Sequence, residues 1–236
     1  MKRHTKAVLG ALGLGWVVTC GGVQAAQLTV SDEFDYRSAS WSAGEPGTDL
    51  VVDQWDPNDY PAGTYLTQIL VELTGSLQGD YQIENEDTAD TTDYYFSQQA
   101  LIDLDGPSSS VTIQANPLVE VGSLFSQITL QQYDGTTDYL GDSGDSYLDS
   151  TDGDLVSDDV ASSDWSLYTG SGTVTFTTES ISGTGENTSG GDPISEKDID
   201  SKARVDVTYF YTIIPEPATF SLLALAGVAL AARRRR

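Results

Sequence analysis

Apolar and polar residues alternate in the last third of the chain. Between residues 203 and 213 the apolar or aromatic side chains occupy every second position: Ala203, Val205, Val207, Tyr209, Tyr211 and Ile213. A period of two residues is typical of a β-strand with one buried face. Similar patterns in residues 66–77, 94–106, 109–116, 124–135 and 172–181 predict further strands, and turn sequences such as Asp105-Gly106-Pro107 separate them.

The spacing of these segments predicts the fold class. Seven to nine short strands and no sustained helical periodicity favour an all-β fold, an antiparallel β-sandwich. Residues 136–164 and 182–201 are rich in Asp, Ser and Gly, so we expect loops there. We expect this domain to span residues 26–214.

Residues 1–25 have a different pattern. Lys2, Arg3 and Lys6 precede an uncharged segment, residues 7–18, and small residues precede the end at Ala25. This pattern predicts a secretory signal peptide that is cleaved after Ala25. Two alternatives are an uncleaved membrane anchor and lipidation at Cys20, although Thr19 replaces the smaller residue that a lipoprotein motif has there.

Residues 215–236 form a third segment. Pro215, Glu216 and Pro217 lead into fifteen uncharged residues, 218–232, and four arginines follow: Arg233, Arg234, Arg235 and Arg236. As a helix the uncharged segment would rise about 22 Å, somewhat less than the ~30 Å hydrocarbon core of a bilayer. We therefore expect a short transmembrane helix in the inner membrane, with the arginines on the cytoplasmic side.

This combination of tripeptide, apolar helix and arginine cluster resembles the PEP-CTERM sorting signal. The resemblance implies that exosortase, a membrane-embedded protease-transpeptidase, recognises the tripeptide and removes the tail. It also implies a Gram-negative host that makes exopolysaccharide. A plain C-terminal anchor that is never processed is the alternative.

The middle of the chain resembles a second family. Residues 66–87, 167–176 and 203–212 are similar to the bacterial surface domain called choice-of-anchor E, in which a strand leads into an "EN" pair and a "YFYT"-like strand closes the domain. The resemblance implies attachment to a C-terminal anchor, and it brings no biochemical activity with it.

Charge and composition exclude several classes of function. Residues 26–214 hold 35 acidic and four basic residues, a net charge of −31, which would repel nucleic acid. They contain no Cys, His or Met, which excludes Ser-His-Asp, Cys-His and the usual zinc sites as well as disulfides. A single D-S-G, at Asp142, cannot form the two-loop site of aspartic proteases. We therefore expect a non-enzymatic protein.

Two binding functions remain as alternatives. Calcium prefers oxygen ligands, and an irregular calcium site could use Asp142, Asp145, Asp149, Asp152 and Asp154, although no EF-hand spacing fits. A glycan could stack on aromatic side chains, although aromatic residues in β-domains more often pack in the core. The candidates are Trp41, Trp55, Tyr60, Tyr65, Tyr94, Tyr95, Trp165 and Tyr168.

Together these patterns predict an exported surface or matrix protein. We expect an inner-membrane intermediate, followed by release to the cell surface or to the exopolysaccharide of a biofilm.

Overall fold

A computed structural model describes residues 24–107, 111–121 and 127–214. These residues form antiparallel strands in two sheets whose inner faces share a hydrophobic core. The predicted all-β class and antiparallel sheets are therefore confirmed. Two short 3₁₀ helices, η1 (Pro57–Asp59) and η2 (Ser162–Leu167), lie in the connections.

The first sheet contains the longest strands. Its order is β1–β11–β4–β9, and β2 pairs with the outer edge of β11. The bounds are β1 (Gln24–Glu33), β2 (Arg37–Ser38), β4 (Thr64–Asn85), β9 (Gly144–Asp159) and β11 (Pro193–Ile213).

The second sheet has the order β3–β10–β5–β6, and β7 and β8 also pair with β5. The bounds are β3 (Leu50–Asp53), β5 (Thr92–Asp105), β6 (Thr112–Ala115), β7 (Leu118–Val121), β8 (Ile128–Leu130) and β10 (Thr173–Ser189). The three short strands β6, β7 and β8 pair with the same side of β5, one after another along it.

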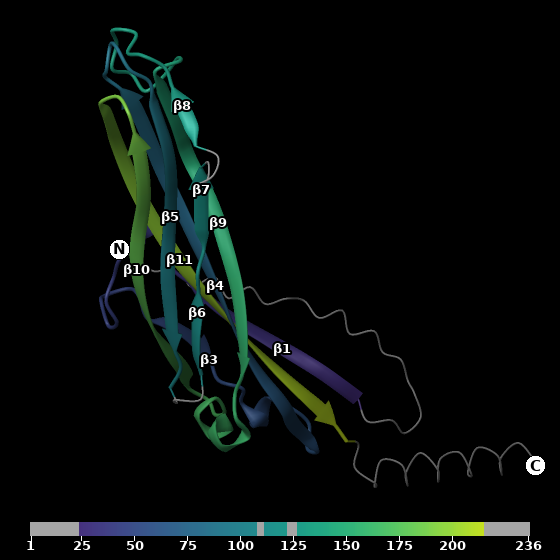
Figure 1. Ribbon diagram of the computed structural model, residues 1–236. Helices are drawn as coiled ribbons and strands as arrows, with labels where there is room; N and C mark the ends of the chain where they lie inside the picture. The colour runs from purple at the N-terminus through teal and green to yellow at the C-terminus, as the bar shows by residue number, and fades with distance from the viewer. Residues whose placement is uncertain (1–23, 108–110, 122–126, 215–236) are drawn as a thin grey trace, which may run out of the picture.

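The molecule is elongated, because β4 and β11 run its whole length side by side (Figure 1). Ile213 pairs with Thr64 at one end of this ladder and Pro193 pairs with Asn85 at the other. We call these the proximal end and the tip. At roughly 3.3 Å per residue, the 21 residues of β11 span about 70 Å.

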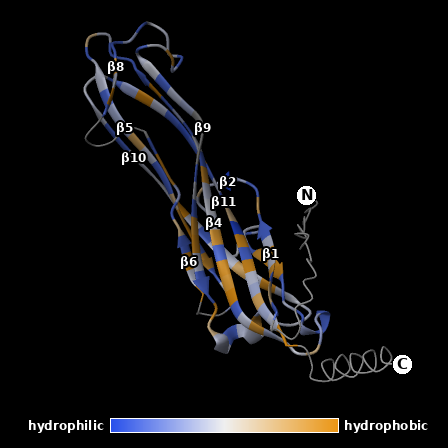
Figure 2. Ribbon diagram, turned by 90° about the vertical axis from the view of Figure 1, so that its right-hand side faces the viewer, coloured by the Kyte–Doolittle hydropathy of each residue, from blue (hydrophilic) through white to orange (hydrophobic). Residues whose placement is uncertain are grey.

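Apolar packing is concentrated in the proximal half. The larger core cluster contains Ile69, Val71, Phe176, Val205 and Tyr209 among many others, contributed by both sheets. The tip has a small separate cluster, formed by Tyr81, Ile83, Tyr94, Phe96 and Leu130. Hydrophobic colours accordingly dominate the half that contains β1, and the half that contains β8 is more polar (Figure 2).

A polar residue separates the two clusters. Gln98 is buried, and neither its Oε1 nor its Nε2 has a hydrogen-bond partner among the described residues. The Gln98 amide lies against Gly79 of β4. The approach is so close that a Cβ on residue 79 would overlap the Gln98 Oε1 atom. Gly79 therefore lets the inward-facing amide of β5 approach the backbone of the opposite sheet.

Both segments predicted to be loops are largely strands. β9 pairs with β4 from Leu70 opposite Asp159 to Glu84 opposite Gly144, so the prediction for residues 136–164 was wrong over most of its length. Residues 182–189 belong to β10 and residues 193–201 to β11, so the second loop prediction was wrong as well. Pairing with the long neighbours β4 and β5 outweighs the loop-like composition. Several strands are also much longer than expected.

Candidate functional site

The proximal end is where the described chain meets both predicted processing segments. Gln24, the first described residue, pairs with Ile213, and Ile213 also pairs with Thr64. The start of β1 and the end of β11 therefore lie next to each other at this end (Figure 1). The predicted sorting tail follows directly after Ile214.

The position of Ile214 is fixed by Gly63. The Ile214 N–H donates to the Gly63 carbonyl at 2.9 Å. Gly63 has φ +85°, and a Cβ there would overlap the Ile214 carbonyl oxygen. Glycine is thus required twice, for its left-handed backbone and for the close approach. The residue immediately before Pro215 is held in place by the folded domain.

An aromatic cluster lies at the C-terminal end of β11 and includes Tyr211 of that strand. Trp55 stacks on Tyr60 with ring centroids 5.0 Å apart, and the Tyr211 ring lies 4.8 Å from that of Tyr60. Burial, with a smaller contribution from Tyr211, raises the pKa of Tyr60. These contacts fix the strand from which the tail leaves.

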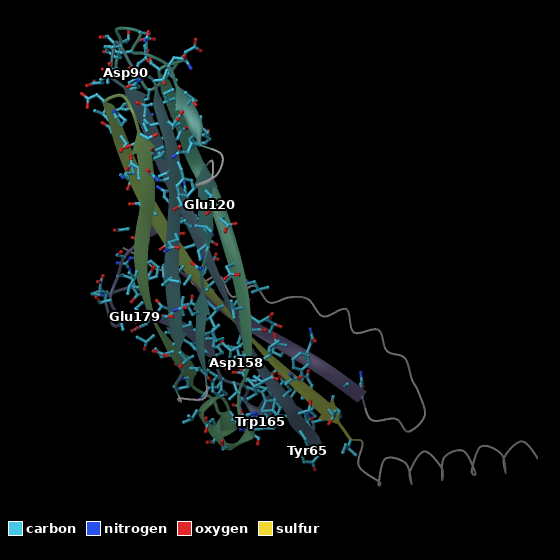
Figure 3. All side chains as sticks on the ribbon, viewed as in Figure 1. Tyr65, Asp90, Glu120, Asp158, Trp165 and Glu179 are labelled. Atoms are coloured by element: carbon cyan, nitrogen blue, oxygen red, sulfur yellow. The ribbon has the colours of Figure 1, made fainter. Side chains whose placement is uncertain are left out.

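Exposed apolar groups surround the same end. Tyr65, which pairs with Thr212, is 58% exposed, and Ile214 is 47% exposed. Figure 3 shows Tyr65 and Trp165 at this end of the molecule. Trp165 is partly buried against the core and donates its indole N–H to the Val160 carbonyl at 3.1 Å, so Tyr65 is the more accessible of the two.

The residues of the predicted sorting signal, Pro215, Glu216, Pro217 and Arg233 to Arg236, lie outside the described residues. So does the predicted transmembrane helix; within the described ranges no helix is long and apolar enough to cross a membrane. Ala25 is described; it lies in β1 and pairs with Thr212 of β11. Cleavage after Ala25 stays a prediction, and it would leave Ala26 as the first residue of that strand.

Residues 214–236 match a family model described as the PEP-CTERM protein-sorting motif. The chain carries a PEP-CTERM signal. This motif implies export, membrane-associated sorting in Gram-negative bacteria and processing by exosortase. The PEP-CTERM match starts at Ile214, which is bonded to Gly63 and directly follows the last residue of β11. The choice-of-anchor E resemblance stays a prediction.

Other comparisons add little. No curated protein matches the chain in sequence. Among solved structures, one of the infectious bursal disease virus Gx strain shares 10% identity and a TM-score of 0.18, covering 89% of this chain and 49% of that one. The VP2 subviral particle of the same virus shares 12% identity and a TM-score of 0.19, covering 90% of this chain and 50% of that one. The chain thus spans about half the length of these proteins, and TM-scores this low support no conclusion.

The five aspartates proposed as calcium ligands are spread along β9 rather than grouped. Asp142 precedes the strand, and Asp145, Asp149, Asp152 and Asp154 follow one another along it. Asp152 and Asp154 accept hydrogen bonds, each 2.8 Å, from the backbone N–H groups of Leu118 and Asn116. These two carboxylates therefore join the edge of the first sheet to the β6–β7 connection of the second.

Asp145 has a different role, near the tip. Its Oδ2 accepts hydrogen bonds from the hydroxyls of Tyr94 (2.5 Å) and Tyr147 (3.0 Å). Burial, and then the bond to Asp145, raises the pKa of Tyr94. Within the part of the chain that the structure describes, no three or more acidic residues are grouped so that they could hold a metal ion.

The aromatic residues proposed as a glycan platform do not share a surface. Trp41, Trp55, Tyr94 and Tyr168 are buried, whereas Tyr65 is exposed at the proximal end. Trp41 donates its indole N–H to the Thr178 hydroxyl and Phe34 packs edge-on against it. These side chains serve mainly as packing groups.

Sequence reasoning missed the residue that organises the tip. The buried side chain of Asn85 donates to the carbonyls of Asp90 and Gln131 and accepts from the N–H groups of Asp87 and Asp192. It therefore ties together the three connections that meet there. The quoted "EN" pair contains Asn85, but one sequence offers no signal for these partners.

A shallow acidic groove was also missed. Asp80 of β4 lies directly opposite Asp198 of β11, and Asp200 and Gln78 complete the lining. Burial, followed by the charges of Asp198 and Asp80, raises the pKa of Asp200. The groove concentrates negative charge on the outer face of the first sheet, and this would attract cations and repel anions.

Proposed function

We propose that this protein is an exported, non-enzymatic surface or matrix protein, which exosortase releases from the inner membrane into an exopolysaccharide matrix. The PEP-CTERM motif at residues 214–236 is the observation that carries the proposal. After processing, an elongated acidic β-domain remains at the surface.

The geometry of the proximal end supports this order of events. β11 ends at Ile213 and the Ile214 N–H is bonded to Gly63. Recognition of the tripeptide that follows would therefore require no strand to unfold. The rest of the molecule extends about 70 Å away from this point. An enzyme in the membrane would therefore reach the cleavage site while the tip projects outward.

Charge and composition support a role in a hydrated matrix. The −31 charge keeps separate molecules apart, and an anionic surface exchanges cations readily. The lack of His and Cys in residues 26–214 favours a non-catalytic role. For the alternative of a calcium-binding module, the described residues contain no group of three or more acidic side chains that could hold a metal ion. For a glycan-binding module, four of the eight candidate aromatic residues are buried.

The proposal is tested by the mass of the exported product. The full chain is expressed in an exosortase-producing host, and the protein is recovered from the cell surface and the medium. We expect intact-mass spectrometry to show a product without Arg233 to Arg236. The double variant Pro215→Ala with Pro217→Ala should keep the tail and stay with the inner-membrane fraction.

The matched control is Pro57→Ala, which changes a proline at the start of η1 and leaves the tail intact. This variant should be processed like the wild type. A surface product that still carries the arginine cluster, or normal processing of the double variant, would refute the sorting proposal.

A further inference from the structure

The outer edge of β10 is open in the half nearer the tip. β3 covers this edge from Thr173 to Phe176, and Trp41 forms an isolated bridge with Ser180. The Ser40 hydroxyl then accepts from the Ser182 N–H at 3.1 Å. Beyond Ser182, no strand among the described residues pairs with this side of β10, although its other side pairs with β5 up to Ser189.

The open edge presents a regular row of backbone groups. The N–H and C=O of Ser180 point outward to Trp41, and in an antiparallel strand every second residue points the same way. The same groups of Thr184, Glu186 and Thr188 therefore face outward as well. The Ser182 N–H is already bonded to Ser40, so the free row runs from Thr184 to Thr188. It is about 13 Å long, enough to form a short ladder with another strand.

The other long edges near the tip carry groups that discourage pairing. β9 is rich in aspartate along its whole length, and the open part of β11 contains Pro193, Glu196 and Asp198. Charged residues and proline on an edge are the usual protection against edge-to-edge association. β1 has an uncharged stretch, but it lies at the proximal end, beside the exit of the tail.

The open edge of β10 is locally neutral in a strongly acidic protein. Glu186 is its one charged residue between Ser182 and Ser189, and it forms an ion pair with Lys197 of β11. The Tyr81 hydroxyl also donates to Glu186, at 3.5 Å. Repulsion between two copies is therefore lowest along this edge.

Gly183 has no evident role inside the domain. A Cβ at this position would have its nearest contact at 3.8 Å, with the side chain of Gln99, so a larger residue would fit. Glycine within a strand lowers stability, and it often marks a place where another backbone approaches closely. This observation is independent of the charge pattern and points to the same edge.

We propose that the open edge of β10 pairs with the same edge of a second copy, antiparallel about a two-fold axis. In the register with Gly185 opposite Gly185, Thr184 faces Glu186 of the other copy. A shift that set Glu186 opposite Glu186 would bring like charges together and would cost stability. Two-fold symmetry closes the assembly at a dimer.

The two-fold axis sets the direction of the two molecules. Because the paired strands run in opposite directions and overlap near the tips, the two proximal ends lie at opposite ends of the dimer. If the protein is displayed as proposed above, molecules on facing surfaces would be joined tip to tip. The pairing itself does not depend on sorting, so it can fail or succeed separately.

A single contact of this kind is weak. A ladder of about five residues buries less than the roughly 1,200 Å² of a standard stable interface. Many such contacts between two coated surfaces would act together, and their combined strength would greatly exceed that of one pair.

The test uses the exported protein purified from its host. Sedimentation equilibrium from about 10 µM to about 1 mM should show a reversible monomer–dimer equilibrium. Small-angle X-ray scattering should show the maximum dimension rising from about 70 Å to about 100 Å as dimer forms, because the overlap is confined to the tips.

Two variants at one position separate backbone pairing from side-chain effects. Thr184→Pro removes an outward N–H that the domain itself does not use, and proline is tolerated on edge strands, so dimer formation should fall at least tenfold. Thr184→Val keeps the N–H and should dimerise like the wild type. Circular dichroism and the melting temperature show that both variants are folded.

Several results would overturn the proposal. These are a wild type that stays monomeric at 1 mM, a dimer whose maximum dimension equals that of the monomer, and mass that keeps growing past the dimer. Equal dimerisation of Thr184→Pro would also do so. If host polysaccharide bound to this edge and the protein did not self-associate, the open edge of β10 would be a glycan-binding surface instead of a dimer interface.

Discussion

The proximal half and the tip half of this molecule share the same two central strands but are stabilised differently. In the proximal half, β4 and β11 contribute alternate side chains to a large apolar core. In the tip half, the apolar cluster is small, and the structure is held together by the hydrogen bonds of the Asn85 side chain and by the bond that the Tyr94 hydroxyl donates to Asp145. One continuous ladder therefore connects a part that folds by burying apolar surface to a part that relies on polar bonds.

This difference indicates an order of stability. Burial of apolar surface supplies most of the free energy of folding, so the proximal half can hold the ladder and the tip is organised on it. Local opening should occur first at the tip. The three predictions below test this order, and the tryptophans help, because Trp41, Trp55 and Trp165 all pack with the proximal core.

The largest effect is expected from Phe176→Ala. Phe176 is fully buried in the proximal core, near the ring of Tyr168. Truncation of a buried phenylalanine lowers the free energy of unfolding by about 3–5 kcal/mol. Both halves should lose stability together, as measured by urea unfolding followed by tryptophan fluorescence and by hydrogen exchange of the tip.

The control is Ile181→Ala on the same strand, where the side chain is 65% exposed. Its effect should stay below about 0.5 kcal/mol. A tip that keeps its exchange protection in Phe176→Ala would mean that the two halves are independent, which contradicts the proposed order.

A smaller and local effect is expected from Asn85→Ala. The substitution leaves four backbone groups at the tip without their partner, and unpaired buried groups cost about 1–3 kcal/mol each when water cannot reach them. Since the tip can admit water, we expect a total of about 2–3 kcal/mol. Hydrogen exchange at residues 85–92 and 131–143 should speed up by roughly a hundredfold.

The fluorescence midpoint of Asn85→Ala should change much less than its exchange rates. Asn58→Ala serves as the control, since Asn58 is exposed and its side-chain amide donates to nearby Asp56, the N-cap residue of η1. A matching loss of stability in the proximal half would show that Asn85 supports the entire ladder.

The smallest effect, and the only stabilising one, is expected from Gln98→Met. Met has a similar length and no polar group, so it removes the desolvation cost of the unpaired amide and joins the two apolar clusters. The free energy of unfolding should rise by about 1 kcal/mol. Gln98→Glu is the matched comparison and should be destabilising, because it buries a charge in the same space.

A decrease in stability for Gln98→Met would contradict the inference that the amide is an unpaired polar group. It would show instead that Gln98 binds a partner such as an internal water. Urea unfolding of both variants at the same pH measures the difference.

The sequence predicts those parts of the fold in which local pattern and tertiary environment agree. Residues 203–213 alternate cleanly because their inner face meets the proximal core, and they do form the last half of β11. Residues 144–159 form an edge strand whose sequence is dominated by Asp, Ser and Gly, so no apolar period marks it. Its strand conformation comes from pairing with β4, which no local pattern contains.

The same reason explains what was missed at the candidate sites. The sorting motif is contiguous, so 22 residues are enough to recognise it. The Gly63–Ile214 clamp and the Asn85 bonds join residues that are far apart in sequence. Gly75 interrupts an apolar run, yet the strand continues through it. The glycine makes room for Ala115 of the opposite sheet, because a Cβ on residue 75 would lie only 2.8 Å from the Ala115 Cβ.

The long pairing of β11 with β4, which has one register shift at Phe210/Tyr211, has a mechanical consequence. The chain leaves the domain at the C-terminal end of β11, and that strand lies between β1 and β4 near this exit. A force that pulls on the exit while the tip is held acts along the strand. It therefore loads many backbone hydrogen bonds in parallel, in shear, instead of opening them one at a time. The ladder would therefore resist tension that is applied between its two ends.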